Sequence, residues 1–168
     1  KEFLENNRTV LFTGTPCQCN ALKTYLGKKY DNLITCDIIC HSNPSPKVFE
    51  KYIKELEKKE GQKIKNIHFR SKENGWRNQT PIIEFENEEK KEENTYFNAF
   101  VRELLGRPSC HSCLFASTNR VTDFTIGDLW GIEKLNIRLK EKNGMSLFTI
   151  NTLKAEKIFN EIKDNINY

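Results

Sequence analysis

Residues 9–40 decide the fold, and they read TVLFTGTPCQCNALKTYLGKKYDNLITCDIIC. The apolar run at 9–14 ends in glycine and predicts a short buried strand. Apolar side chains then recur at helical spacing over residues 18–26, which predicts an amphipathic helix. A second nearly continuous apolar run at 32–40 predicts another buried strand. The order strand, helix, strand is typical of parallel α/β folds.

The next helix is predicted by its first residues, because Ser45 is a favourable N-cap and Pro46 suits the first helical turn. Gly61 is predicted to end it. Further patterns predict strands at 64–72, 81–86, 121–126 and 145–150, and turns at 87–94 and 127–131. They also predict a helix at 153–166 and one at 96–105 whose inward residues are Phe100, Val101, Leu104 and Leu105. We therefore expect an α/β fold with a mixed, partly parallel sheet flanked by helices and a cysteine-bearing loop near the strand ends. We expect residues 1–168 to form a single domain.

The composition is that of an ordinary globular protein, with 37% hydrophobic residues, 30% charged residues and a net charge of +4. No apolar run approaches the roughly 20 residues that a membrane-spanning helix needs. Nucleic-acid binding favours a stripe of basic residues with aromatic residues among them, and this sequence has no such stripe. We expect a cytoplasmic protein without membrane insertion. Because the sequence starts without methionine and its first strand comes early, we also expect it to be a fragment of a longer protein.

Six cysteines is a high number for a chain without a visible secretion signal. Clustered cysteines in such proteins more often serve metal or redox chemistry than disulfides. The strongest pattern is Cys110-His-Ser-Cys113, a CxxC motif that brings two thiolates to one ion. This motif occurs in zinc sites, iron–sulfur sites and redox dithiols, and alone it does not choose among them.

Cys17 follows the first predicted strand at the head of a helix, and Cys40 ends the second strand. If these strands are parallel neighbours, both cysteines lie at the same edge of the sheet, where α/β proteins place their sites. Together with the CxxC they supply four thiolates, the number that a 4Fe–4S cluster takes. A rival is zinc held by the CxxC, one of these two cysteines and a histidine, His41 or His111.

Cys19 and Cys36 are weaker ligand candidates. Cys19 lies two residues into the predicted helix, and Cys36 lies in the middle of an apolar strand. A free cysteine among apolar residues behaves as a small hydrophobic side chain. We therefore expect Cys36 in the core and Cys19 outside the ligand set.

Six motifs follow one another in a recognisable order. They are GTPCQ (14–18), CDIICHSNPSP (36–46), HFRSKENGW (68–76), RPSCHSC (107–113), DFTIGDLWGIEK (123–134) and GMSLFTINT (144–152). In these motifs the chain resembles the C-terminal domain of the coenzyme F420 hydrogenase/dehydrogenase beta subunit family, over roughly residues 9–162. Members of that family are iron–sulfur flavoproteins, and some pass electrons between a cluster, FAD and the deazaflavin coenzyme.

The resemblance implies that this chain is the electron-transfer domain of an oxidoreductase. It implies a 4Fe–4S cluster, FAD in the full-length protein, and a redox partner protein or a deazaflavin or flavin as the electron partner. Many members carry an N-terminal ferredoxin-like part with further clusters, which we expect to be missing from this sequence. The catalytic residues stay unknown at this level.

The family pattern places the metal ligands at Cys17, Cys40, Cys110 and Cys113. Cys19 and Cys36 stand where the family usually has aliphatic residues, which supports leaving them out. One departure is Ser42, because the family commonly has glycine after the Cys-His pair. That substitution affects the local turn rather than a ligand.

Five further residues are candidates for contact with a flavin. Arg70, Lys72 and Trp76 resemble the family's FRxK…GW segment, and Asp128 and Trp130 belong to GDLWG. Cations beside an aromatic ring suit flavin phosphates or the ring itself, whereas a structural turn with a packed tryptophan explains the same residues equally well. Two functional alternatives to the cluster also stay open: a zinc-stabilised binding domain, and a cofactor-free interaction domain on the same fold.

Overall fold

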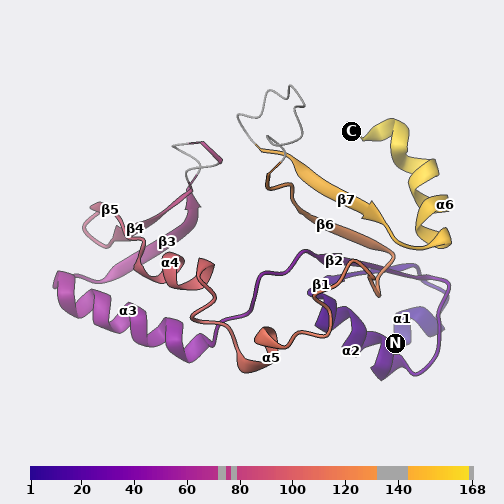
Figure 1. Ribbon diagram of the computed structural model, residues 1–168, viewed down its shortest axis with the longest axis horizontal. Helices are drawn as coiled ribbons and strands as arrows, with labels where there is room; N and C mark the ends of the chain where they lie inside the picture. Colours follow the sequence, from indigo (N-terminus) through magenta and orange to yellow (C-terminus); the bar gives the residue numbers. More distant parts are fainter. Residues whose placement is uncertain (72–74, 77–78, 132–143, 167–168) are drawn as a thin grey trace. The chain divides into compact units, whose positions relative to one another are not determined.

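The computed structural model describes residues 1–71, 75–76, 79–131 and 144–166. These residues form two compact units, whose elements are labelled in Figure 1. The first unit takes its described residues from Lys1–Cys40, Leu114–Ile137 and Met145–Tyr168, and the second from His41–Cys113 and Arg138–Gly144. No helix within the described ranges is long and apolar enough to cross a membrane.

A four-stranded sheet with the order β1-β2-β6-β7 forms the first unit. Its strands are β1 (Val10–Gly14), β2 (Leu33–Ile38), β6 (Phe124–Asp128) and β7 (Ser146–Ile150). β1, β2 and β6 run parallel, and β7 runs antiparallel to β6. The predicted α/β class with a mixed, partly parallel sheet is confirmed.

Helix α2 (Pro16–Leu26) makes the crossover from β1 to β2. Pro16 occupies its first turn, where the N–H that proline lacks would have no partner within the helix. Gln18 Oε1 accepts a hydrogen bond from the backbone N–H of Thr15 at 2.9 Å. Gly27 ends the helix in the left-handed conformation, with φ of +70°. These local signals explain why the predicted helix forms.

The apolar core of the first unit lies where α1 (Glu2–Glu5) and α2 pack on the sheet. Leu4, Leu26 and Leu33 are its buried centre, each 5% exposed. By strand register, Phe148 of β7 lies on the opposite face from Leu33. There α6 (Leu153–Ile162) contributes Phe159, whose ring centroid is 5.9 Å from that of Phe148. A 3-10 helix, η3 (Lys163–Asn165), follows α6.

The second unit contains an antiparallel sheet with the order β3-β4-β5. Its elements are α3 (Pro46–Glu60), β3 (Ile64–Ser71), β4 (Thr80–Phe85), β5 (Lys90–Glu92), α4 (Thr95–Val101) and α5 (Pro108–His111). Leu56 of α3 packs with Ile83 and Phe85 of β4, and these three side chains are at most 5% exposed. Four aromatic rings extend this core: Phe49, Tyr52, Phe69 and Tyr96.

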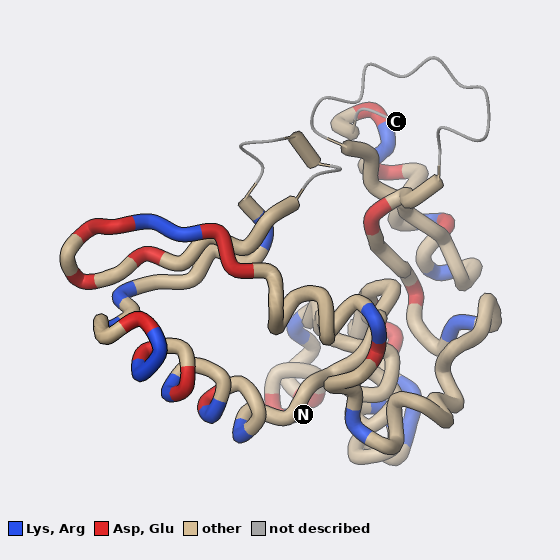
Figure 2. Tube along the Cα trace, turned by 60° about the vertical axis from the view of Figure 1, so that its left-hand side comes forward, with Lys and Arg blue, Asp and Glu red and all other residues tan. Residues whose placement is uncertain are grey.

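Charges of both signs alternate along α3 and the β4–β5 hairpin of the second unit (Figure 2). Lys91 Nζ lies 2.8 Å from the Glu60 carboxylate, and Lys63 Nζ lies 2.8 Å from that of Glu57. Exposed pairs of this kind contribute little to stability individually. This part of the surface is therefore a mixed polar surface rather than a patch of one charge.

The helix predicted at 96–105 is shorter than expected. Helix α4 ends at Val101, and Glu103 has a φ of +61°, which a continuing right-handed helix does not allow. Val101 and Leu104, which were expected to face inward, are 51% and 73% exposed. The prediction of their burial was wrong, and for Leu104 the reason is that the helix does not continue to this residue.

Other boundaries also differ from the sequence prediction; the helix predicted at 153–166, for example, ends at Ile162 and is followed by η3. Strand β6 begins at Phe124 rather than at residue 121, and it continues through Gly127 and Asp128, which were expected in a turn. Asp123 directs its carboxylate back to β2 instead of extending the strand. The expected turn at 87–94 contains β5, whose backbone pairs with β4 although its side chains are charged and exposed.

Candidate metal centre

Cys17 and Cys40 follow neighbouring parallel strands at the same edge of the first unit's sheet. The last register pair of β1 and β2 is Gly14 with Asp37, and each cysteine lies three residues further along the chain. Both cysteines are exposed. The carboxyl edge of a parallel sheet is where α/β proteins place their sites. The position of both residues near the ends of these strands agrees with the sequence prediction.

The surroundings of Cys17 favour negative charge. Cys17 lies in the first turn of α2, and its Sγ is 3.1 Å from the hydroxyl oxygen of Thr15. The N-terminal end of a helix carries partial positive charge from its unpaired N–H groups. An anionic group bound at Cys17 would therefore lie at the positive end of α2.

In the second unit, the residues after Cys40 lie against those that lead into the CxxC. Pro44 forms an isolated antiparallel bridge with Gly106. A Cβ added to Gly106 would lie 3.5 Å from the Cβ of Ser42 and 3.4 Å from Nε2 of His111. Ser42, two residues beyond Cys40, and His111, inside the CxxC motif, thus both lie beside Gly106.

The histidines near these cysteines have contacts of their own. His41 Nε2 lies at hydrogen-bond distance, 3.1 Å, from the carbonyl oxygen of Phe100, and the two rings meet edge to face at 5.0 Å. Cys110 lies on α5, a one-turn helix, and its N–H donates to the carbonyl of Arg107 at 2.8 Å. A zinc site that used His41 through Nε2 would have to replace its contact with Phe100.

The chain passes between the two units next to the predicted ligands. It leaves the first unit after Cys40 and returns to it after Cys113. These two cysteines therefore mark the ends of the continuous stretch that builds most of the second unit.

Cys19 and Cys36 have environments unlike those of the other four cysteines. Cys19 is fully buried, and burial together with the Asp37 carboxylate raises its pKa to about 11. Burial and Asp37 also raise the pKa of Cys36. A thiol must lose its proton to bind iron or zinc, and these surroundings disfavour that loss at both residues. Cys36 is half-buried rather than a full core residue as expected, and Cys19 is the buried one.

The remaining four cysteines suit a 4Fe–4S cluster in number and in chemistry. Cys17, Cys40 and Cys113 are exposed, Cys110 is half-buried, and none of the four is in a disulfide. Such a cluster takes four thiolates. Over the described part of the chain, no three His, Cys, Asp or Glu side chains are already gathered as a group that could hold a metal ion.

The predicted flavin contacts divide between the two units. Arg70 is on β3 in the second unit, and its Nε donates to Gln79 Oε1 at 2.6 Å. Asp128 ends β6 in the first unit, and Trp130, two residues later, is 60% exposed. Lys72 lies outside the described residues.

Trp76 is a packed residue of the second unit. Its side chain is 4% exposed. A Cβ added to Gly144, which has a φ of +82°, would lie 2.6 Å from the Trp76 ring. The indole therefore covers a backbone position that only glycine allows. Of the two roles expected for Trp76, flavin contact and structural packing, this placement agrees with structural packing.

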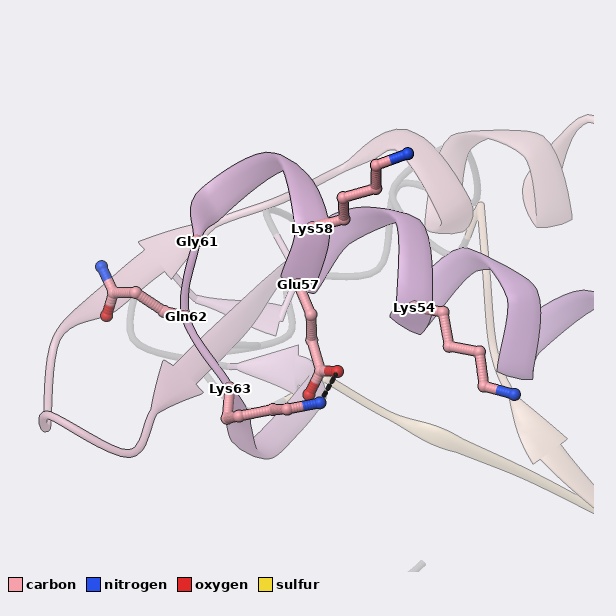
Figure 3. Close-up of a pocket in the computed structure, with 6 residues that line it drawn as sticks. All are labelled: Lys54, Glu57, Lys58, Gly61, Gln62 and Lys63. Atoms are coloured by element: carbon pink, nitrogen blue, oxygen red, sulfur yellow. Dashed lines mark hydrogen bonds and ion pairs between the residues drawn. The ribbon is translucent and has the colours of Figure 1, made fainter.

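An open pocket at the end of α3 is lined by Lys54, Glu57, Lys58, Gly61, Gln62 and Lys63 (Figure 3). Lys63 donates a hydrogen bond to Glu57, and this bond lowers the pKa of the Glu57 carboxyl. None of the residues predicted to bind metal or flavin is in this lining. We regard the pocket as part of the mixed polar surface of α3.

Sequence reasoning missed a buried polar network in the first unit. Asp123, 4% exposed, accepts hydrogen bonds from the N–H and hydroxyl of Thr35 at 2.8 and 2.9 Å and from the hydroxyl of Thr152 at 2.9 Å. Lys154 Nζ lies 3.1 Å from the same carboxylate. Burial raises the pKa of Asp123, but these hydrogen bonds outweigh it and lower the pKa overall. An acidic residue before an apolar strand is too common a pattern to reveal such a network.

Comparison with known families and proteins gave one result. A search of curated proteins found no match. The family model for the C terminus of the beta subunit of coenzyme F420 hydrogenase/dehydrogenase matches residues 7–168, which is nearly the whole chain. The chain therefore belongs to the family of coenzyme F420 hydrogenase/dehydrogenase beta subunits, which are subunits of oxidoreductases, and it corresponds to their C-terminal part.

Proposed function

We propose that this chain holds a 4Fe–4S cluster through Cys17, Cys40, Cys110 and Cys113 and transfers electrons within a flavin-dependent oxidoreductase. The observation that supports the proposal is that the chain segments carrying these cysteines are connected to one another in two steps. Strand register joins the loop of Cys17 to that of Cys40, and the packing at Gly106 joins the residues after Cys40 to the CxxC. Family membership supports the same chemistry.

Three local structures supply the four ligands. Cys17 comes from the start of α2, Cys40 from the end of β2, and the CxxC from α5 and the residues after it. A bound cluster supplies one-electron transfer. The chain would supply the thiolates and, beside Cys17, the positive end of α2 and the Thr15 hydroxyl, which would tune the reduction potential.

We further propose that FAD serves the oxidoreductase of which this chain is a subunit domain. The electron partner is then a redox protein or a deazaflavin or flavin. Asp128 and Trp130 of the first unit, and Arg70, Lys72 and Trp76 of the second, are our candidates for flavin contact. Clustered metal-binding cysteines also favour a reducing compartment, the cytoplasm.

The test is the metal content of six single alanine variants, one for each cysteine, after anaerobic reconstitution with iron and sulfide. The parent chain is expected to bind about four irons. Replacing Cys17, Cys40, Cys110 or Cys113 is expected to lower the iron content and the broad visible absorption near ~400 nm. Cys19→Ala and Cys36→Ala are the matched controls and are expected to keep both.

The alternatives give different results in the same experiment. A colourless parent chain with one zinc would support the zinc-stabilised domain. A parent chain that takes up neither metal would support the cofactor-free interaction domain. Equal loss of iron in the Cys36→Ala variant and in the Cys113→Ala variant would contradict the proposed ligand set.

A further inference from the structure

The chain at the end of β2 lies against a glycine of β6. A Cβ added to Gly127 would lie 3.0 Å from each of three carbon atoms of Ile39, its Cβ, Cγ1 and Cδ1. Carbon atoms in contact prefer a separation of about 3.5–4.0 Å, so a methyl group at Gly127 would displace Ile39 by about 0.5 Å or more. The Ile39 side chain therefore takes the space that a side chain of residue 127 would need.

The backbone of Ile39 is fixed to β6 at the same place. Its N–H donates a hydrogen bond to the carbonyl oxygen of Ile126 at 2.8 Å. This bond follows the last register pair of the two parallel strands, which joins Ile38 to Ile126. The backbone and the side chain of Ile39 are therefore both held against β6, although β2 itself ends one residue earlier.

The residues just before Ile39 are held as well. Arg120 Nη2 donates a hydrogen bond to the carbonyl oxygen of Ile38 at 3.1 Å, and Arg120 Nε donates to Thr125 Oγ1 of β6 at 3.3 Å. The same guanidinium lies 3.0 Å from the carboxylate of Asp37, which is fully buried. The chain is thus fixed at three successive residues, of which Ile39 is the last.

Cys40 is the residue that comes directly after this fixed stretch, and it is exposed. Because Cys40 shares a peptide bond with Ile39, a displacement of Ile39 also displaces the backbone that carries the Cys40 thiol. Gly127, Ile39 and Cys40 all belong to the first unit, and so does Cys17. The support that Gly127 gives to Cys40 therefore depends on contacts within the first unit alone.

We propose that Gly127 is a positioning residue for the metal ligand Cys40: because it has no side chain, Ile39 lies on β6 and holds Cys40 at the edge of the sheet where Cys17 also lies. The inference rests on the proposed function for its purpose. Glycine inside a strand is unfavourable, because it loses more conformational freedom on folding than any other residue. Such a glycine often marks a close approach of another group, and here that group is Ile39.

The test measures the effective concentration of Cys40 and Cys17 for each other in a metal-free chain, in which alanine replaces every other cysteine except the fully buried Cys19. Dibromobimane alkylates one thiol and then the other. Each new carbon–sulfur bond releases one bromide and one proton, and the bridged product fluoresces. Added glutathione competes for the second carbon–bromine bond. The glutathione concentration that captures half of the singly attached reagent equals the effective concentration of the second thiol.

Gly127→Ala is expected to lower this effective concentration about tenfold, because small displacements of reacting groups have large effects on such reactions. Ile39→Gly removes all three atoms that the new methyl group would meet. In a chain that carries Ile39→Gly, the further change Gly127→Ala is therefore expected to alter the value by less than about twofold. The control is Ile150→Ala, which shortens an apolar side chain of β7 opposite Phe124, at the other end of β6. It is expected to alter the value by less than about twofold.

A Gly127→Ala value within about twofold of the parent chain would overturn the inference. A parent chain that gives no bridged product would overturn it too, as would an equal loss from Gly127→Ala with and without Ile39→Gly. If Gly127→Ala does not fold, Ile39→Gly alone decides: it is expected to lower the value about tenfold, and an unchanged value would count against the inference. Iron binding by the parent chain tests the proposed function separately, because the bridging measurement needs no metal.

Discussion

Replacement of Asp123 by alanine is expected to destabilise the first unit strongly, because this carboxylate satisfies several buried groups at once. It accepts both hydrogen bonds from Thr35 and one from Thr152, and it pairs with Lys154. Alanine would leave the N–H of Thr35, which is buried, without this acceptor. We expect a loss of about 4 kcal/mol in the free energy of unfolding, as for other buried pairs from which one partner is removed.

Asparagine at the same position separates geometry from charge. Its carbonyl oxygen can accept both bonds from Thr35, and its amide group can face the hydroxyl of Thr152. The charge pairing with Lys154 is lost. We expect Asp123→Asn to cost about 1.5 kcal/mol, the difference between charged and neutral hydrogen bonds.

The assay is urea unfolding at pH 7, followed by circular dichroism, with the slope of the transition compared between variants. Asp164→Ala, which removes an exposed carboxylate of η3, is the control and is expected to change stability by less than about 0.5 kcal/mol. An Asp123→Ala variant within about 1 kcal/mol of the parent chain would refute the reasoning.

The stabilising role of the Asp123 carboxylate can also be tested through the pH dependence of the free energy of unfolding. The folded pKa of Asp123 is below its unfolded value. Its contribution is therefore fully present above the unfolded pKa of about 3.9 and is lost as the pH falls through the folded pKa. The stability difference between the parent chain and Asp123→Asn is expected to be constant near neutral pH and to shrink below about pH 4. A difference that grows on acidification would contradict the assignment.

Two further predictions concern single residues. In the native metal-free chain, iodoacetamide is expected to alkylate the exposed Cys17 and to leave Cys19 unmodified, because Cys19 is fully buried and burial raises its pKa to about 11. Mass spectrometry of the peptides measures the labelling of each cysteine, and rapid labelling of Cys19 would contradict its burial. Gly144→Ala is expected to cost about 3 kcal/mol, since it adds a clash with Trp76 to a φ of +82°. Gly131→Ala, with the same φ and no atom of the described residues within 4 Å of the added Cβ, is expected to cost about 1 kcal/mol. Equal costs in urea unfolding would show that the tryptophan does not press on Gly144.

Patterns local in the sequence predicted the elements that position the cysteines. The apolar run that ends at Gly14 and the helical period after it gave β1 and α2, and Gly61 ended α3 as expected. Because the parallel crossover follows from these elements, the common edge for Cys17 and Cys40 could be predicted too. The sequence did not predict which of the other two cysteines is buried, because Cys36 was expected in the core and Cys19 is the buried one.

The parts that sequence reasoning missed depend on contacts between distant positions. Asp123 reaches Thr35, and Arg120 reaches Ile38, across more than 80 residues of chain. The spacing of apolar residues along the sequence cannot reveal contacts between such distant residues. β5 escaped prediction because its backbone pairs while its side chains are charged, and Leu104 was misplaced because the positive φ of Glu103 interrupts the helical period.

The central claim is that this chain binds a 4Fe–4S cluster, and the most direct test is the iron and sulfide content of the anaerobically reconstituted parent chain. We predict about four irons and four sulfides per chain, with visible absorption that dithionite bleaches. A chain that stays colourless after reconstitution, whether it holds one zinc or no metal, would contradict the account.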